Sequence, residues 1–358
     1  MSRFLMVDIG AGTMDILFYD DEADLSYKAV VQSPMLSIAE QAARLPGNLL
    51  LNGCEMGGGT ISSILKKRAQ EAEVVMSVSA AATIHHNLER VTALGIKVVE
   101  DREVEALSQS GKYSVLTLSD LEPERLRNIV EGFGVPFAFD ILGVCAQDHG
   151  AAPPGVSHLD YRHHIFRGVL DENPFPEALL YHKNEVPTAL NRLRSIAESC
   201  NWLPAGDVYV MDSGMAAILG ASLDIQAAAK QKILVLDIAT SHTVGAALER
   251  GELAAFFEYH TRDITLKRLE QLLPELAEGK LEHSQILAEG GHGAYTRKAL
   301  GFQACEIIVA TGPKRKLLQN SQLPIHFGAP FGDNMMTGTV GLLEAIGRRR
   351  GLKPKRYV

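Results

Sequence analysis

Two short segments of the sequence each place an aspartate immediately before a turn of small residues. Residues 8–13 read DIGAGT, and residues 237–242 read DIATSH. Small side chains leave backbone N–H groups free to approach an anion closely. A carboxylate beside such a turn repels a bare phosphate, and a Mg²⁺ ion held mainly through water and shared with the phosphate oxygens resolves that conflict. Asp8 and Asp237 therefore indicate binding of a metal-bound nucleotide.

These two segments belong to longer units that repeat each other. Residues 4–31 and 233–259 each read as an apolar strand that ends in Asp, a small-residue turn and two further strands. At a constant offset along the chain, Asp8 corresponds to Asp237. A single glycine-rich turn is a weak signal because such turns are common for structural reasons. The duplication makes the signal much stronger and predicts two halves of one design.

The elements that must position these residues follow an α/β pattern, in which apolar strand-like runs alternate with segments of helical periodicity. Strands are predicted at 74–78, 115–118, 137–144 and 208–211, and helices at 61–72, 80–94, 122–133, 187–200 and 264–276. Periodicity lapses in 146–187, which is rich in Pro, His and Gly and is expected to be a long loop or insertion. We therefore predict one domain over 1–186, with an insertion at 146–186, and a second over 187–358 whose last helix is a candidate to return to the first.

Length, charge and apolar runs narrow the class of protein. The 358 residues predict two or three domains, since a typical domain has roughly 150. The net charge of −8 argues against nucleic acid and anionic membrane surfaces as partners. The N-terminal apolar run is too short for a signal peptide, and no run approaches 18 apolar residues. A cytoplasmic protein is expected.

The cysteines of the chain argue against a locally bound iron–sulfur cluster. Cys54, Cys145, Cys200 and Cys305 lie far apart, and no two of them form a CxxC pair. Thiols this sparse indicate a reducing compartment without a disulfide framework.

Taken together, the motifs resemble the actin-like ATPase superfamily of sugar kinases, heat-shock chaperone ATPases, actin and the acetate kinases. The matching segments occur in the expected order: 7–13 (first phosphate motif), 212–220 (first connecting motif), 236–241 (second phosphate motif), 307–314 (adenosine motif) and 332–345 (last connecting helix). The resemblance implies an α/β fold of two related actin-like, ribonuclease H-like domains with a nucleotide cleft between them.

The resemblance also implies ATP and Mg²⁺ as cofactors. In that superfamily each domain contributes one hairpin that binds phosphates. Asp8 and Asp237 would hold the metal through water. The remaining contacts are expected from Gly10, Gly12, Thr13, Thr240 and Ser241 to the phosphates and from Gly312 to the nucleoside. The sequence departs from the pattern at Ala239 and His242, where the first motif has a glycine and a threonine, and this weakens the second phosphate site.

Three carboxylates are candidates for catalysis. Asp15 shares a strand face with Thr13 and could place a water or the metal. In sugar kinases an acid near the first connecting motif activates the acceptor hydroxyl, and Asp212 lies at about that place. The alternative is that Asp212 is the N-cap of the helix that follows. Asp148 and His149 come just after an apolar run and are predicted to face a substrate.

Two glycine-rich segments have alternative interpretations. Gly57, Gly58 and Gly59 precede a predicted helix, so they offer free N–H groups to an anionic substrate, or they form a tight structural turn. Residues 289–293, which contain three glycines and His292, are interpreted as a loop.

Within the superfamily, the chain most resembles a prokaryotic group labelled, by distant analogy, "putative pyruvate formate-lyase activating enzymes". The label should not be taken literally, because radical activation needs three closely spaced cysteines for a cluster, and the cysteines of this chain are far apart. A radical enzyme is therefore not expected.

We hypothesise Mg²⁺-dependent ATP hydrolysis coupled to the activation or remodelling of a partner protein. The alternatives are a small-molecule kinase that transfers the γ-phosphate to a metabolite, and a nucleotide sensor without catalysis. Partner-stimulated hydrolysis would indicate the first, and ATP consumption only with a metabolite would indicate the second. The acceptor, the partner protein and the oligomeric state, including a homodimer, stay open.

Overall fold

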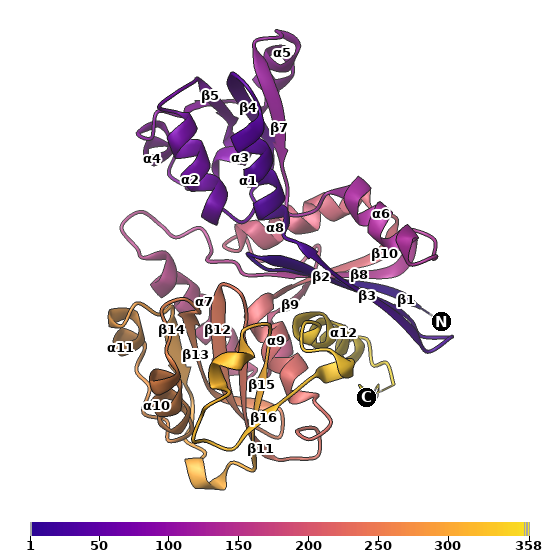
Figure 1. Cartoon of the computed structure of the whole chain (residues 1–358), viewed down its shortest axis with the longest axis vertical. Helices are drawn as coiled ribbons and strands as arrows, with labels where there is room; N and C mark the ends of the chain where they lie inside the picture. Colours follow the sequence, from indigo (N-terminus) through magenta and orange to yellow (C-terminus); the bar gives the residue numbers. More distant parts are fainter. Residues whose placement is uncertain (1, 354, 356, 358) are drawn as a thin grey trace.

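Two six-stranded sheets form the frame of the molecule (Figure 1). The structure is a computed structural model that describes residues 2–353, 355 and 357. In spatial order, the first sheet consists of β3 (Leu25–Gln32), β2 (Thr13–Asp20), β1 (Arg3–Ile9), β8 (Phe139–Ala146), β10 (Ala205–Asp212) and β9 (Leu180–His182). The second consists of β14 (Gly293–Thr296), β13 (Glu252–His260), β12 (His242–Glu249), β11 (Lys232–Ile238), β15 (Ile307–Thr311) and β16 (Ile325–Phe327).

The two sheets share one connectivity. In each, three consecutive antiparallel strands (β1 to β3, and β11 to β13) are extended by two parallel strands (β8 and β10, and β15 and β16). This common order is that of the ribonuclease H-like domains of actin-like proteins. The predicted fold class, two related α/β domains, is therefore confirmed.

The α-helices cover the faces of these two sheets and of a smaller, inserted sheet. They are α1 (Pro34–Arg44), α2 (Gly59–Arg68), α3 (Val78–Ala81), α4 (Leu88–Thr92), α5 (Val104–Gln109), α6 (Pro123–Gly132), α7 (His158–Glu172), α8 (Asn191–Ser199), α9 (Ser213–Ser222), α10 (Leu266–Ala277), α11 (His283–Ala288) and α12 (Thr337–Arg349). Short 3₁₀ helices are η1 (Asp101–Glu103), η2 (Pro176–Leu179), η3 (Cys200–Trp202), η4 (Phe302–Ala304), η5 (Arg315–Leu318) and η6 (Pro330–Gly332).

One layer of helices serves both sheets. The alternation of side chains along β1 sends Phe4 and Met6 into a core that also contains Ile233 and Val235 of β11. Helices α7, α9 and α12 and further strands of both sheets also contribute to this shared core. The outer face of the first sheet packs against α6 and α8, and the outer face of the second packs against α10 and α11.

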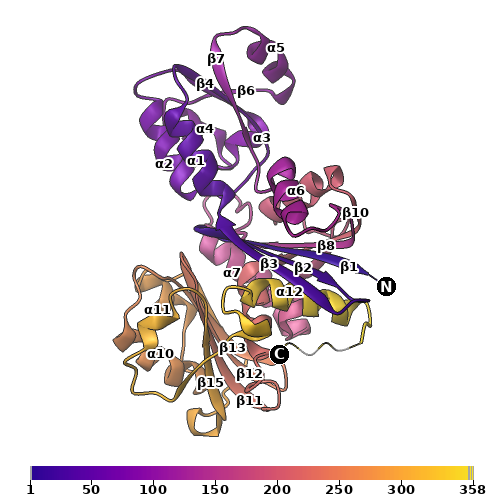
Figure 2. The ribbon, with the colours of Figure 1, turned by 45° about the vertical axis from the view of Figure 1, so that its right-hand side comes forward.

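A smaller α/β unit is inserted between β3 and β8, at the top of Figures 1 and 2. Its parallel sheet consists of β6 (Lys97–Val99), β5 (Val74–Ser77), β4 (Asn48–Gly53) and β7 (Tyr113–Leu118). Helices α1 to α4 cover one face of this sheet, and α5 covers the other. Several of its elements were predicted, but the sequence pattern did not show that they form a separate body with its own core.

The structure differs from the predicted element pattern in three places. The segment 146–187, predicted as irregular, contains the 15-residue helix α7. The helix predicted at 80–94 is two short helices, because the Asn87 side chain accepts from the Glu89 N–H and begins a new helix at α4. Strand β10 lies beyond the predicted boundary at residue 186 but pairs with β8, so the first half extends to Asp212. Helix α12 at the end of the chain packs against β1 and β8 of the first sheet.

Among the residues that the structure describes, none of the helices combines the length and the apolar character needed to traverse a bilayer.

Glycines allow α9 and α12 to cross closely inside the shared layer. A Cβ added to Gly341 of α12 would lie 1.8 Å from the Ala216 carbonyl oxygen of α9. A Cβ added to Gly220 of α9 would lie 1.9 Å from the Thr337 carbonyl oxygen of α12. The two backbones are therefore in direct contact, and no larger residue fits at either position.

Gly341→Ala should lower the free energy of unfolding by about 1–3 kcal/mol, because the added methyl forces the two helices apart. Gly347→Ala on the same helix is the matched control, since a Cβ there meets nothing within 4 Å. It should be neutral or stabilising by up to about 1 kcal/mol, because alanine favours a helix over glycine. Chemical denaturation followed by circular dichroism measures both, and equal stabilities of the two variants would contradict the close crossing.

Candidate functional site

The turns at the ends of β1 and β11 have the same backbone geometry. In the first, the Gly10 N–H donates to the Thr13 carbonyl oxygen over 3.0 Å. In the second, the Ala239 N–H donates to the His242 carbonyl oxygen over the same distance. The repeat visible in the sequence is thus a repeat of hydrogen bonding.

A hydroxyl group beyond the third strand of each unit holds its turn. The Ser33 hydroxyl donates to the Gly10 carbonyl oxygen over 2.7 Å, and the Thr261 hydroxyl donates to the Ala239 carbonyl oxygen over 2.9 Å. These two bonds restrain both turns in the same way. They leave the tips of the hairpins free to face the opposite half.

The two hairpins meet at one end of a cleft of about 980 Å³ that lies between the halves. Most residues predicted for the site line this cleft: Asp8, Gly10, Thr13, Asp15, Gly57, Gly58, Gly59, Asp148, His149, Asp237, Thr240, Ser241 and Gly312. Gly12 does not line it. A Cβ on Gly12 would lie 2.9 Å from the Thr240 hydroxyl oxygen, so this glycine permits the contact between the hairpins. The phosphate contact expected from Gly12 stays a prediction beside this packing role.

Three carboxylates converge beside the hairpins. Asp8 lies directly opposite Asp15 in the pairing of β1 with β2. Burial raises the pKa of Asp15 to about 8, with repulsion from Asp8 as the next cause. Burial also raises the pKa of Asp8 and of Asp237 to about 6, although hydroxyl groups oppose this shift. Burial and like charges disfavour the ionised form of these carboxyl groups, and a bound cation would favour it.

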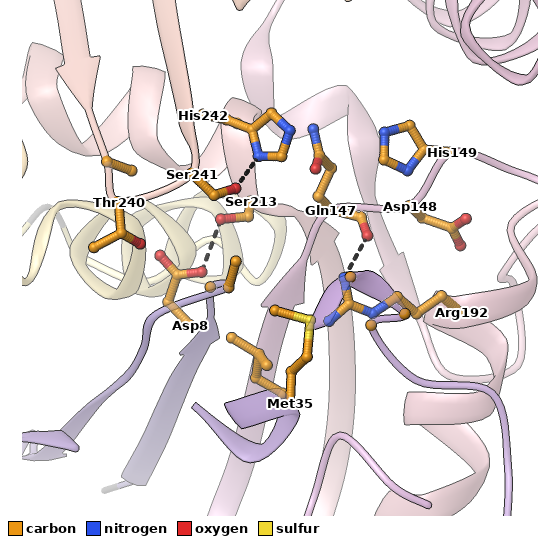
Figure 3. A pocket seen from close by; sticks show the side chains of 18 of the residues that line it. Asp8, Met35, Gln147, Asp148, His149, Arg192, Ser213, Thr240, Ser241 and His242 are labelled. Carbon is orange, nitrogen blue, oxygen red and sulfur yellow. Dashed lines mark hydrogen bonds between the residues drawn. The ribbon is translucent and has the colours of Figure 1, made fainter. Parts of the chain in front are cut away.

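Neighbouring groups orient the carboxylates of the two hairpins. The Ser213 hydroxyl donates to Asp8 Oδ1 over 2.8 Å (Figure 3), and the Thr311 hydroxyl donates to Asp237 Oδ1 over 2.8 Å. A Cβ on Gly338 would lie 1.9 Å from Asp8 Oδ2, so the first turn of α12 reaches the carboxylate. Ser213 begins α9, so the N-termini of both central helices approach the cleft.

The site has a suitable donor set for Mg²⁺. Oδ1 of Asp15 is buried without a hydrogen-bond partner, which leaves a carboxylate oxygen available. Oxygen ligands, above all carboxylates, are those that Mg²⁺ prefers, and it commonly keeps several waters. The residues present, Asp8, Asp15 and Asp237, therefore fit the ligand preference of this ion.

Asp212 is an N-cap and an ion-pair partner. Its Oδ1 accepts from the Met215 N–H over 3.1 Å, and its Oδ2 accepts from Arg162 Nη2 over 2.9 Å. It does not line the cleft. Burial raises the pKa of Asp212, and the positive charge of Arg162 opposes this shift. The catalytic interpretation of Asp212 is therefore corrected to the alternative already given for it, the start of α9.

Arg162 links the two halves of the molecule. Its Nη1 donates over 2.6 Å to Oε2 of Glu258, which lies on β13 of the second sheet. Burial alone would raise the pKa of Glu258, but the adjacent guanidinium lowers it well below its ordinary value. Arg162 is thus a buried cation between two carboxylates, one from each half. Removing one partner of such a group leaves an uncompensated buried charge.

Asp148 lines the cleft, but backbone groups occupy its carboxylate. Oδ1 accepts from the Gly150 N–H over 2.8 Å, and Oδ2 accepts from the Leu193 N–H over 3.0 Å. These bonds fasten the loop after β8 to the first turn of α8. His149 beside it has a pKa lowered to about 3, chiefly by burial. In Figure 3 the Asp148 carboxylate lies apart from Asp8.

The glycine cluster combines a tight turn with a wall of the cleft. A Cβ on Gly58 would lie 2.5 Å from the Thr83 carbonyl oxygen, and one on Gly57 would lie 2.9 Å from Arg192 Nη2. The absence of side chains is therefore required by packing, as the structural interpretation of this segment predicts. The same residues nevertheless line the cleft.

Sequence reasoning missed a set of polar side chains at the end of the cleft near the inserted unit. Arg192 donates to both Asp120 oxygens over 2.7 and 2.8 Å, and to the Gln147 carbonyl oxygen over 2.8 Å (Figure 3). His86 Nε2 lies 2.9 Å from a Glu55 oxygen, a contact that raises the pKa of His86. No local motif marks these residues, because four separate segments supply them.

Three histidines lie close enough together to share one ion. Within residues 2–353, 355 and 357, the one group of three His, Cys, Asp or Glu side chains whose potential ligand atoms all lie within 4.8 Å of one another consists of His242, His260 and His292. Imidazole nitrogens suit Zn²⁺ and related metals.

A family model described as "Putative pyruvate format-lyase activating enzyme (DUF1786)" matches residues 56–317, which is most of the chain. Among curated proteins, no sequence matches.

Similar solved structures have low sequence identity. A chain of the PilM–PilN type IV pilus biogenesis complex is 11% identical, with 98% of each chain covered and a TM-score of 0.40. AlfA from the B. subtilis plasmid pLS32, in a filament, is 10% identical, with 96% of this chain and 98% of that chain covered and a TM-score of 0.37. A Bacteroides thetaiotaomicron protein with an actin-like ATPase fold and unknown function is 7% identical, with 96% and 95% covered and a TM-score of 0.35. The fold assignment rests on the strand order described above.

Asp15→Asn should raise the melting temperature at pH 8 without Mg²⁺. The folded-state pKa of about 8 lies above the ordinary value of 3.8, so stability falls as the pH rises between these values. One pKa unit corresponds to about 1.4 kcal/mol, so relief of a single unit should add about 2 °C. Calorimetry with a chelator present measures the change. The exposed Glu22→Gln removes one charge as a control, and an unchanged or lower melting temperature for Asp15→Asn would contradict the strained carboxylate group.

Proposed function

We propose that this chain, which belongs to the family described as "Putative pyruvate format-lyase activating enzyme (DUF1786)", binds Mg²⁺ and ATP between its two hairpins and hydrolyses the ATP. The convergence of Asp8, Asp15 and Asp237 on one end of the cleft carries this proposal. Neighbouring carboxylates whose pKa values are raised by burial are suited to a metal–nucleotide complex. We further propose that the hydrolysis serves to activate or remodel a partner protein.

The hairpins and the central helices would bind the triphosphate. Thr240 and Ser241 offer hydroxyl groups to phosphate oxygens, and Gly10 has no side chain to block their approach. The N-termini of α9 and α12 add the positive ends of two helix dipoles. Gly312 has a φ of +86° and lies against Asp237, where a bare backbone can approach the nucleoside. Positioning and charge neutralisation supply most of the catalysis of phosphoryl transfer.

Asp15 is the candidate to hold and deprotonate the attacking water. A general base is most effective when its pKa lies near the working pH, and the pKa of Asp15 is about 8. When bound, Mg²⁺ would neutralise the charge of the phosphates and of Asp8 and Asp237. Asp148 is a weaker candidate, because its oxygens already accept from backbone N–H groups.

A small-molecule kinase is the second candidate function. The cleft continues from the hairpins to the inserted unit, where Gly57, Glu55, His86 and Arg192 line it. Its volume of about 980 Å³ lies near the top of the range of roughly 300–1,000 Å³ for ligand pockets. The additional polar end would suit a small acceptor beside the nucleotide, with His149 and the glycines 57–59 as its contacts.

Asp8→Asn should weaken binding of Mg²⁺ with a non-hydrolysable ATP analogue by at least about tenfold, because one metal-facing charge is lost. Isothermal calorimetry measures the affinity, and Glu22→Gln should bind as the wild type does. Equal affinity of Asp8→Asn and the wild type would contradict the assignment.

A phosphate-release assay with ATP alone, with cell extract and with a metabolite panel separates the functions. Release that is stimulated by extract supports the ATPase, and ADP formation that depends on a metabolite supports the kinase. Binding without either would leave a sensor.

Affinity for the Mg²⁺–nucleotide complex should rise with pH between 5 and 7. Asp8 and Asp237, with pKa values of about 6, lose their charge as the pH falls. The ionised fraction of each carboxylate falls roughly tenfold as the pH falls from 7 to 5. Titrations without Mg²⁺ at the same pH values correct for protonation of the nucleotide itself. A Mg²⁺-dependent part of the affinity that does not change with pH would exclude these carboxylates as the metal site.

A further inference from the structure

Three histidines gather beside the second hairpin on the wall of the cleft. His242 begins β12, His260 ends β13, and His292 immediately precedes β14. These strands are neighbours in the second sheet, and His242 lies opposite His260 in their pairing. The three ring centroids are 4.4 to 4.9 Å apart. One potential ligand nitrogen from each ring lies within 4.8 Å of the other two.

Neighbouring polar groups leave one nitrogen of His242 free. The Ser241 hydroxyl bonds to Nδ1 of His242 (Figure 3). Nε2 of the same ring is buried and has no hydrogen-bond partner. A metal-binding imidazole is typically oriented through its second nitrogen in this way.

His292 faces a carboxylate with one ring nitrogen and a second imidazole with the other. Its buried Nδ1 makes no hydrogen bond but lies 3.4 Å from Oε1 of Glu258, and its Nε2 lies 3.1 Å from Nε2 of His260. A carboxylate behind a histidine is a common outer partner in metal sites. Two nitrogens bound to one tetrahedral ion at about 2.0–2.1 Å lie roughly 3.3 Å apart. The observed separation of the two Nε2 atoms is close to that value.

We propose that His242, His260 and His292 bind a divalent transition metal, such as Zn²⁺, through their Nε2 atoms. Three histidines with an open fourth position are a ligand set of catalytic zinc sites. All three residues line the cleft. Imidazole nitrogens suit zinc and related metals, whereas Mg²⁺ takes oxygen ligands. The site is thus chemically distinct from the aspartate site.

This site has no counterpart at the first hairpin. The residue that corresponds to His242 in the first unit is Thr13, which cannot contribute an imidazole. The two hairpins share a backbone but differ in the ligands that they present. The nitrogen-bound metal would therefore be a feature of the second half only.

Cobalt titration of the untagged full chain tests the proposal. Wild-type protein should bind one equivalent of Co²⁺ with visible absorption bands of a nitrogen-rich site, and Zn²⁺ should displace it. His242→Thr, which installs the residue of the first hairpin, and His260→Ala should each weaken binding at least about 100-fold, and Ser241→Ala about tenfold. His164→Ala on α7 removes an exposed histidine and should bind as the wild type does.

Two results would overturn the proposal: no Co²⁺ bands in the wild type, or equal Co²⁺ affinity of His242→Thr and His164→Ala. Circular dichroism melts without metal identify a variant that fails to fold, and the second variant then decides. Asp8→Asn should keep Co²⁺ binding while losing affinity for the Mg²⁺–nucleotide complex. Failure of the histidine site is therefore distinguishable from failure of the nucleotide site.

Discussion

The single layer of helices shared by both sheets is the constraint on which the rest of the structure depends. Because α12 packs against β1 and α9 packs against β11 within one core, the two strands present the same face to that core. The last residues on that face are Asp8 and Asp237, which must then point toward each other and toward the first turns of the two helices. Glycines at the helix crossing make so thin a layer sterically feasible. The cleft and its carboxylates are consequences of this packing.

Burial of charge divides the polar groups of the cleft into two kinds. Arg162 satisfies Glu258 and Asp212 within the protein, and these three groups join the halves at the base of the cleft. Within the described part of the chain, Asp8, Asp15 and Asp237 form no ion pair, and burial raises their pKa values. The first kind joins the two halves, whereas the second is left to face the cleft. This contrast separates structural carboxylates from those proposed to act on a nucleotide.

Duplication explains the common backbone of the hairpins, and divergence explains their different chemistry. Both turns have the same backbone hydrogen bond, and in both a hydroxyl group donates to the carbonyl oxygen of the turn. The first hairpin adds Asp15, while the second has a valine at that position and places His242 at the cleft. The resulting asymmetry gives the cleft an oxygen-rich side and an imidazole-rich side.

The sequence by itself determined the duplicated hairpins and the α/β class of the two halves, because strand alternation and small-residue turns are local patterns. Only the tertiary structure decided that Asp212 pairs with Arg162 and that Gly12 packs against Thr240, since both contacts join residues distant in the chain. The same holds for Arg192 and for His292, which join the cleft through contacts across separate segments. Local patterns record backbone geometry, whereas convergence of side chains depends on how helices and sheets pack.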